Sequence, residues 1–210
     1  MAEHARDALL QMNLPNRLTL ARVVMAPIFV GLMSVDHAAS FALAYVTFTA
    51  AAITDYYDGK IARERNLVSN FGKLWDPVAD KVIMSAAFVM MMTMPELCIP
   101  GWTVVAILTR EFVITGARSF AASDGLVIGA NRWGKTKTVV QIVYVQVFLF
   151  FAVAGRVLAY WQPAFVRDHY SVWLGYASLL SIIMVALYTL YSGLQFARMN
   201  LHSFGIGKAQ

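Results

Sequence analysis

The sequence predicts an all-α integral membrane protein with six transmembrane helices, and three observations lead to this prediction. Of the 210 residues, 59% are hydrophobic and only 14% are charged, whereas soluble domains carry about 25% charged residues. The apolar residues form six stretches that approach the roughly 20 residues a helix needs to cross the hydrocarbon core. Four aspartates lie within residues 55–80, around the end of the second stretch and the start of the third, which indicates a polar site at one membrane face.

The predicted helices follow one another with short connections. The expected spans lie near residues 18–35, 39–60, 77–95, 101–121, 137–160 and 171–196. Residues 2–11 are expected to form a short helix on the membrane surface, with Leu9 and Leu10 facing lipid and Arg6 facing headgroups. The chain is therefore expected to be one domain, with the surface segment at 1–13, a six-helix core at 14–196 and a tail at 197–210.

Basic residues predict the orientation. They concentrate between spans two and three (Lys60, Arg63, Arg65, Lys73 and Lys81) and between spans four and five (Arg132, Lys135 and Lys137). Because cytoplasmic loops of membrane proteins carry the excess of Lys and Arg, both termini and the polar cavity are expected to face the cytoplasm. The net charge of +5 is assigned to these loops rather than to nucleic-acid binding. The lack of a transit-like leader favours a bacterial inner membrane.

Four aspartates form the candidate site. Asp55 and Asp58 are three residues apart, and Asp76 and Asp80 are four apart, so on helices each pair shares a face. Converging carboxylates repel one another unless a cation lies among them. Oxygen ligands suit Mg²⁺ or Mn²⁺, and two such ions about 4 Å apart can bind the attacking and leaving oxygens of a phosphoryl transfer. The alternative is that each aspartate pairs with a nearby Lys or Arg.

Residues around the aspartates fit the same chemistry. Gly59 lets a nucleotide approach the backbone, and Ala62 keeps the next turn clear. Arg63 can bind a phosphate through two donors, and Gly72 opens the approach to the third aspartate. Asp80 is the expected proton acceptor, since three carboxylates can hold the ions while the fourth takes the proton of a substrate hydroxyl.

The run Asp-x2-Asp-Gly-x2-Ala-Arg-x8-Gly-x3-Asp-x3-Asp at residues 55–80 resembles the signature of the CDP-alcohol phosphotransferases, with every position filled. Other segments resemble the bacterial phosphatidylglycerophosphate synthases within that family. These segments are Leu14–Arg22, Asn66–Lys73, Asp76–Lys81, Arg110–Phe112 and Gly134–Thr138. The resemblance extends to about residue 145, and beyond that point only the hydropathy is similar.

The resemblance implies a six-helix membrane enzyme, a homodimer, that binds CDP-diacylglycerol in a cytoplasm-facing cavity. Asp55 and Asp76 would contact both ions, Asp58 the first and Asp80 the second, with Asp80 also acting as the base. The liponucleotide would be bound by residues in and before the signature, which are Asn16, Thr19, Gly59, Ala62, Arg63, Ser69 and Gly72.

The second substrate is expected to carry a phosphate. Arg110 lies near the middle of span four, and Arg118 follows eight residues later on about the same stripe. An arginine at that depth must face a cavity or a partner, so Arg110, Arg118 and Lys135 are predicted to bind the phosphate of glycerol-3-phosphate. Alternatively, Arg110 only pairs with Glu111 and Arg118 marks the membrane boundary. Lys137 is interpreted as a residue whose ammonium group reaches the headgroups.

The expected activity is transfer of the phosphatidyl group from CDP-diacylglycerol to glycerol-3-phosphate, giving phosphatidylglycerophosphate and CMP. Alternatives with the same chemistry use phosphatidylglycerol (a cardiolipin synthase), inositol phosphate or serine as the acceptor, and the cations disfavour serine. A divalent-cation transporter is the alternative of another class. An ion path would need polar groups through the outer half of the bundle, where spans two and three offer few.

Overall fold

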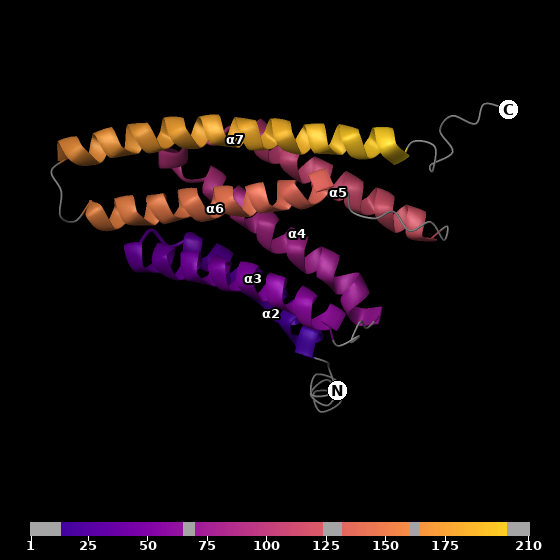
Figure 1. Ribbon diagram of the computed structural model, residues 1–210. Helices are drawn as coiled ribbons and strands as arrows, with labels where there is room; N and C mark the ends of the chain where they lie inside the picture. Colours follow the sequence, from indigo (N-terminus) through magenta and orange to yellow (C-terminus); the bar gives the residue numbers. More distant parts are fainter. Residues whose placement is uncertain (1–13, 65–69, 124–131, 160–163, 201–210) are drawn as a thin grey trace. The chain divides into compact units, whose positions relative to one another are not determined.

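The computed structural model of the chain is helical in the parts that it describes (Figure 1). These parts are the backbone of residues 14–64, 70–123, 132–159 and 164–200, and the side chains of 17–55, 75, 78–122, 133–134, 136–159 and 168–200. The elements in order are α2 (Leu14–Met33), α3 (Ala38–Glu64), α4 (Asn70–Met92), the 3₁₀ helix η1 (Pro95–Leu97), α5 (Gly101–Ser123), α6 (Arg132–Leu158) and α7 (Ala164–Asn200).

Each of the six predicted spans coincides with one α-helix, so the all-helical prediction is confirmed. The predicted surface helix at 2–11 lies outside the described residues. The helices extend beyond the predicted spans at the ends that carry the aspartates: α3 continues to Glu64, and α4 begins at Asn70. Hydropathy marks the thickness of the membrane, whereas backbone hydrogen bonds continue a helix into water. All four aspartates occupy helical positions, and Asp76 is the one that lies outside the predicted spans and is included because α4 begins earlier.

Three of the described segments are long and apolar enough to cross a membrane: Ala38–Asp55 of α3, Thr136–Leu158 of α6 and Asp168–Asn200 of α7. The described parts of the other three helices, α2, α4 and α5, do not meet the same measure of length and apolar composition. Large apolar side chains are exposed along all six helices. A surface of this kind is favourable against lipid and unfavourable against water.

The chain divides into two compact units, residues 1–90 and 91–210. In the first unit, α2 and α3 pack against each other as a hairpin around the turn at 34–37. Buried residues recur at helical spacing on both helices (Ala26, Phe29 and Met33 on α2; Phe41, Ala44, Phe48 and Ala51 on α3). The rings of Phe29 and Phe48 lie 6.0 Å apart. This packing fixes the position of the polar residues farther along both helices.

In the second unit, α7 packs against α5, α6 and η1, and α6 also touches η1. Figure 1 shows α6 and α7 running alongside each other. The interior is apolar toward the η1 end, where Phe148, Leu149, Ala152 and Leu174 are buried. Toward the other end of α6 it becomes polar, with Arg110, Glu111, Lys137, Gln141, Thr189 and Ser192 all buried. Buried charges at this density in an apolar bundle indicate function.

Candidate functional site

In the first unit, α2 and α3 bring together Arg22 and Asp55. Nη1 of Arg22 donates a hydrogen bond to Oδ1 of Asp55 and forms an ion pair with it, across 33 residues of sequence. The side chain of Arg22 is 1% exposed, whereas that of Asp55 is 43% exposed. Thr19, three residues before Arg22 on α2, is also buried. The hairpin thus presents one predicted metal ligand at its surface and supports it with a buried cation.

Asp80 lies in α4 with a local partner. Nζ of Lys81 lies 2.8 Å from its Oδ2, and both side chains remain partly exposed. The carboxylate of Asp80 thus has a partner on its own helix and remains partly accessible to solvent.

The remaining predicted residues of the aspartate region are described only in part. Asp58, Gly59, Ala62 and Arg63 occupy α3, Gly72 and Asp76 occupy α4, and Asn16 occupies α2, but their side chains lie outside the description, as does all of Ser69. Among the described side chains, no group of three or more His, Cys, Asp or Glu residues could hold a metal ion. Since only two of the four aspartates are included, the two-ion site stays a prediction.

The chemistry of the predicted ligands nevertheless fits a hard divalent cation. All four are carboxylates, and oxygen donors select Mg²⁺ or Mn²⁺ over softer metals. The two aspartates whose side chains are described also pair with basic residues, Asp55 with Arg22 and Asp80 with Lys81, as the alternative interpretation expects.

The second unit contains a buried ionic cluster centred on Glu111. Oε1 of Glu111 accepts hydrogen bonds from Nη1 of Arg110 at 3.2 Å, from Nζ of Lys137, and from Nε2 of Gln141 at 3.4 Å. Arg110 also donates from Nη2 to Oγ of Ser192 at 2.9 Å. The donors come from α5 and α6 and the hydroxyl from α7, so the cluster joins all three helices.

Arg118 lies farther along α5, with its guanidinium over the ring of Phe196 at 5.1 Å from the centroid. The charges of Arg110 and Glu111 are close enough to act on it. The Nε atoms of Arg110 and Arg118 are both buried, and neither has a hydrogen-bond acceptor within the described part of the chain. A buried charged donor without an acceptor is destabilising by about 1–3 kcal/mol or more. Two such donors in one region fit an anionic ligand.

The structure agrees with part of the predicted acceptor site and differs from the prediction for Lys137. Arg110 and Arg118 lie in one region, as predicted, while the side chain of Lys135 lies outside the description. The alternative pairing of Arg110 with Glu111 is also observed. The interpretation of Lys137 is wrong: this side chain is 5% exposed and pairs with Glu111, because a buried carboxylate one helix away attracts it inward.

Three residues of these two clusters received no individual role from the sequence, namely Arg22, Gln141 and Ser192, and Glu111 received one only as the alternative partner of Arg110. The available signal was a polar side chain within an apolar helix, which is expected to face a partner or cavity. That signal marks Arg22 and Gln141 individually. It does not say which helix supplies the partner.

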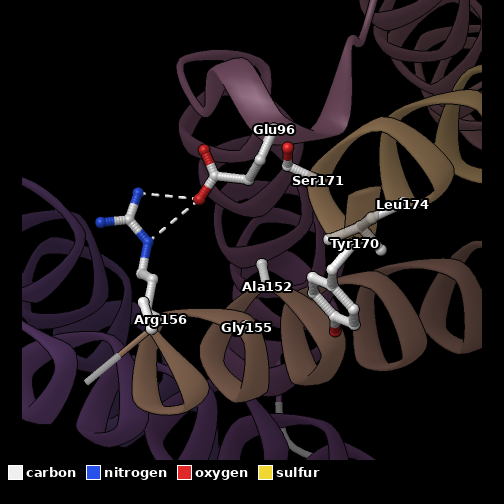
Figure 2. Close-up of a pocket in the computed structure, with 8 residues that line it drawn as sticks. Glu96, Ala152, Gly155, Arg156, Tyr170, Ser171 and Leu174 are labelled. Atoms are coloured by element: carbon white, nitrogen blue, oxygen red, sulfur yellow. Dashed lines mark hydrogen bonds and ion pairs between the residues drawn. The ribbon is translucent and has the colours of Figure 1, made fainter. Parts of the chain in front are cut away.

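A separate cavity of about 140 Å³ lies in the second unit and is mainly apolar (Figure 2). Glu96 and Arg156 stand at one side, with Nε and Nη2 of Arg156 at 3.0 and 2.9 Å from Oε1 of Glu96. Arg156 is 19 residues from Lys137 along α6, about 28 Å at the rise of an α-helix. This cavity is thus remote from the Glu111 cluster. Its ion pair ties η1 to α6.

Comparison with known proteins gives matches that include residues of both units. The sequence profile of the CDP-alcohol phosphatidyltransferase family matches residues 12–184, which include the four aspartates and, from the Glu111 cluster, Arg110, Glu111, Lys137 and Gln141 but not Ser192. A Bacillus subtilis protein named CDP-diacylglycerol–glycerol-3-phosphate 3-phosphatidyltransferase is 40% identical over 153 residues, covering 65% of this chain and 76% of its own. A Rickettsia typhi protein of the same name is 36% identical over 137 residues, covering 65% and 76%.

A third relative is named as a probable phosphatidylglycerophosphate synthase. It comes from Mycobacterium tuberculosis and is 39% identical over 140 residues, covering 65% of this chain and 66% of its own. Since the family profile matches residues 12–184, most of the sequence, the chain belongs to the CDP-alcohol phosphatidyltransferase family.

Proposed function

We propose that this protein transfers the phosphatidyl group of CDP-diacylglycerol to glycerol-3-phosphate, forming phosphatidylglycerophosphate and releasing CMP. The observation that carries the proposal is the family match together with relatives named for this reaction. The buried cations of the second unit support an acceptor that itself carries a phosphate. No observation favours the transporter alternative.

The proposed reaction uses a base and two sets of binding residues. Asp80 takes the proton from the acceptor hydroxyl, and the resulting oxygen attacks the phosphorus that bears the diacylglycerol. The bond from that phosphorus to the bridging oxygen breaks, and CMP leaves. Asn16, Thr19, Gly59, Ala62, Arg63, Ser69 and Gly72 are proposed to bind and orient the liponucleotide. Arg110, Arg118 and Lys135 are proposed to hold the acceptor phosphate in line for attack.

Two divalent cations, Mg²⁺ or Mn²⁺, are proposed to be held by Asp55, Asp58, Asp76 and Asp80. Bound there, they would supply electrostatic stabilisation of the diphosphate and of the charge that develops during transfer. The partial exposure of Asp80 suits a residue that must also take a proton from a substrate.

The acceptor can be identified directly. Purified protein would be incubated with CDP-diacylglycerol labelled in the phosphatidyl group and offered glycerol-3-phosphate, phosphatidylglycerol, inositol phosphate or serine in turn. We expect labelled phosphatidylglycerophosphate from the first acceptor alone. A labelled product from another acceptor, with none from glycerol-3-phosphate, would reassign the protein within the same family.

Replacing Arg118 should affect the acceptor selectively. We expect Arg118→Ala to raise the KM for glycerol-3-phosphate about 10- to 100-fold, because a charge-assisted hydrogen bond is worth about 1.5–3 kcal/mol. The KM for CDP-diacylglycerol should change less than about threefold. Arg118→Lys, which keeps the charge and loses the planar donor pair, should be intermediate. Equal increases in both KM values would remove Arg118 from the acceptor site.

The membrane arrangement proposed here has six spans, with both termini and the active site on the cytoplasmic side of a bacterial inner membrane and with the protein as a homodimer. The exposed free thiol of Cys98 follows η1, between α4 and α5. This connection lies on the outer face in the proposed topology. The exposed apolar side chains of the helices support their insertion in a membrane. The distribution of Lys and Arg along the sequence supports the orientation of the termini and the active site.

Labelling of Cys98 tests that topology. We expect a membrane-impermeant maleimide to modify the wild-type protein on intact spheroplasts and to leave Cys98→Ser unmodified. As a matched control, Ser203→Cys in the Cys98→Ser background should be modified only after the membrane is permeabilised. Labelling of both sites, or of neither, before permeabilisation would contradict the arrangement of termini and turns.

A further inference from the structure

Glu111 is an unexpected residue in the proposed acceptor site, because it places a negative charge beside the arginines that are proposed to bind phosphate. It is 6% exposed, and its Oε1 accepts hydrogen bonds from Arg110, Lys137 and Gln141. Lys137 and Gln141 come from α6, while Glu111 adjoins Arg110 on α5. Three hydrogen-bond donors hold this buried carboxylate in one position, unlike a carboxylate on the surface.

Arg110 is held from several directions. Its Nη1 donates a hydrogen bond to Glu111, and its Nη2 donates one to Ser192 at 2.9 Å. Gly193 has no side chain and so leaves room for the aliphatic part of Arg110. A Cβ atom at position 193 would lie only 3.0 Å from Cγ of Arg110 and 3.4 Å from its Nε. The guanidinium therefore has one orientation, with both terminal nitrogens engaged and Nε, which has no acceptor in the described part of the chain, still able to donate.

The charges of the cluster need a carboxylate. Arg110 and Lys137 are both at least nine-tenths buried and both positive. Without a negative charge between them they would repel each other in a medium that screens poorly. Glu111 reduces the net charge of the three groups to +1. Gln141 is in turn fixed by Oγ1 of Thr189 at 3.2 Å, so the arrangement of Glu111 does not depend on a single contact.

We infer that Glu111 is a positioning residue of the acceptor site: its carboxylate fixes Arg110 and balances Lys137, so that Arg110 is oriented for the phosphate of the acceptor before that substrate arrives. This inference rests on the proposed function. Glu111 itself touches no substrate in this scheme. Pre-orientation lowers the entropy lost on binding, and it should therefore appear in the affinity for the acceptor.

The direction in which one substitution changes the KM for glycerol-3-phosphate distinguishes this positioning role from simple electrostatic attraction of the acceptor. Glu111→Gln keeps the size and an acceptor oxygen but makes the cluster one unit more positive. If only net charge mattered, the anionic acceptor would bind more tightly and its KM would fall. If Glu111 positions Arg110, the two uncompensated cations should move apart, and the KM for glycerol-3-phosphate should rise about tenfold or more. The KM for CDP-diacylglycerol should stay within about threefold.

The double variant Glu111→Gln with Lys137→Gln supplies a rescue. It restores the net charge of the cluster to +1, and we expect the acceptor KM to return to within about threefold of the wild-type value. Glu111→Asp, which keeps the charge on a shorter stem, should be intermediate. Tyr144→Phe is the matched control, because it removes a buried hydrogen bond between α6 and α7 (to Ser178, at 2.8 Å) in which no residue of the cluster takes part. It should leave both KM values unchanged.

A second variant tests the same role without changing any charge. Gly193→Ala places a methyl group against the stem of Arg110 and should raise the acceptor KM several-fold. Gly31→Ala, where a Cβ meets nothing within 4 Å, should not. A fall in acceptor KM in Glu111→Gln, or equal effects on both substrates, would overturn the inference. Failure of the wild-type protein to use glycerol-3-phosphate would overturn the proposed function instead, and the wild-type assay detects that separately.

Discussion

Asp80→Asn should abolish phosphatidyl transfer while leaving CDP-diacylglycerol bound. Asparagine has the shape of aspartate but cannot accept a proton at neutral pH, and general-base catalysis contributes about 10²–10⁴-fold to a rate. The loss of one charge from the predicted ion site should add to this effect, so we expect turnover to fall about a thousandfold or more. Initial rates with labelled CDP-diacylglycerol would measure the loss. Equilibrium binding of the liponucleotide would measure what remains.

The matched control for Asp80 is Asp36→Asn. Asp36 is exposed in the turn between α2 and α3, at the other end of α3 from Asp55, and its substitution should leave turnover within about twofold of wild type. Turnover near the wild-type level in Asp80→Asn would refute the base assignment. Loss of liponucleotide binding together with turnover would instead assign Asp80 mainly to the binding of ions and substrate.

The sequence was sufficient for the features that depend on local spacing. Six apolar stretches predicted six helices, and the three- and four-residue spacings of the aspartates placed them at helical positions that the structure confirms. The predicted positions of the helix ends are less accurate, because hydropathy falls at the end of the apolar stretch whereas α3 and α4 continue as helices beyond it. The convergence of the four carboxylates stays a prediction, because only Asp55 and Asp80 have described side chains.

The pairings between helices could not be predicted. Arg22 meets Asp55 across 33 residues, and Lys137 meets Glu111 across 26. Such contacts depend on which faces pack together, and in lipid every outward face is also apolar, so hydropathy does not distinguish a lipid-facing stripe from an interhelical one. For the same reason the burial of Lys137 was missed: the sequence places it at the end of a span, where a lysine ordinarily extends to water.

Removal of divalent cations should stop the reaction completely and reversibly. The carboxylates of the signature and the diphosphate of the substrate are all negative, so without cations their repulsion opposes both binding and transfer. We expect activity to fall to the background level in excess chelator and to return on addition of Mg²⁺ or Mn²⁺. Equal ionic strength of a monovalent salt should not restore it, because screening of charge cannot replace ions bound by carboxylates.

A readout independent of turnover connects this effect to the aspartates. An ion that binds only the folded protein stabilises it by RT ln(1 + [L]/Kd), about 2.7 kcal/mol at a concentration of 100 Kd. Mg²⁺ should therefore raise the Tm of the detergent-solubilised wild-type protein, and Asp76→Asn should weaken this increase and shift it to higher Mg²⁺ concentrations. Asp36→Asn should respond as the wild type does, because it lies away from the signature. Transfer that persists in excess chelator would contradict the two-ion proposal. A rise in Tm that is equal in Asp76→Asn would place the ions elsewhere on the protein.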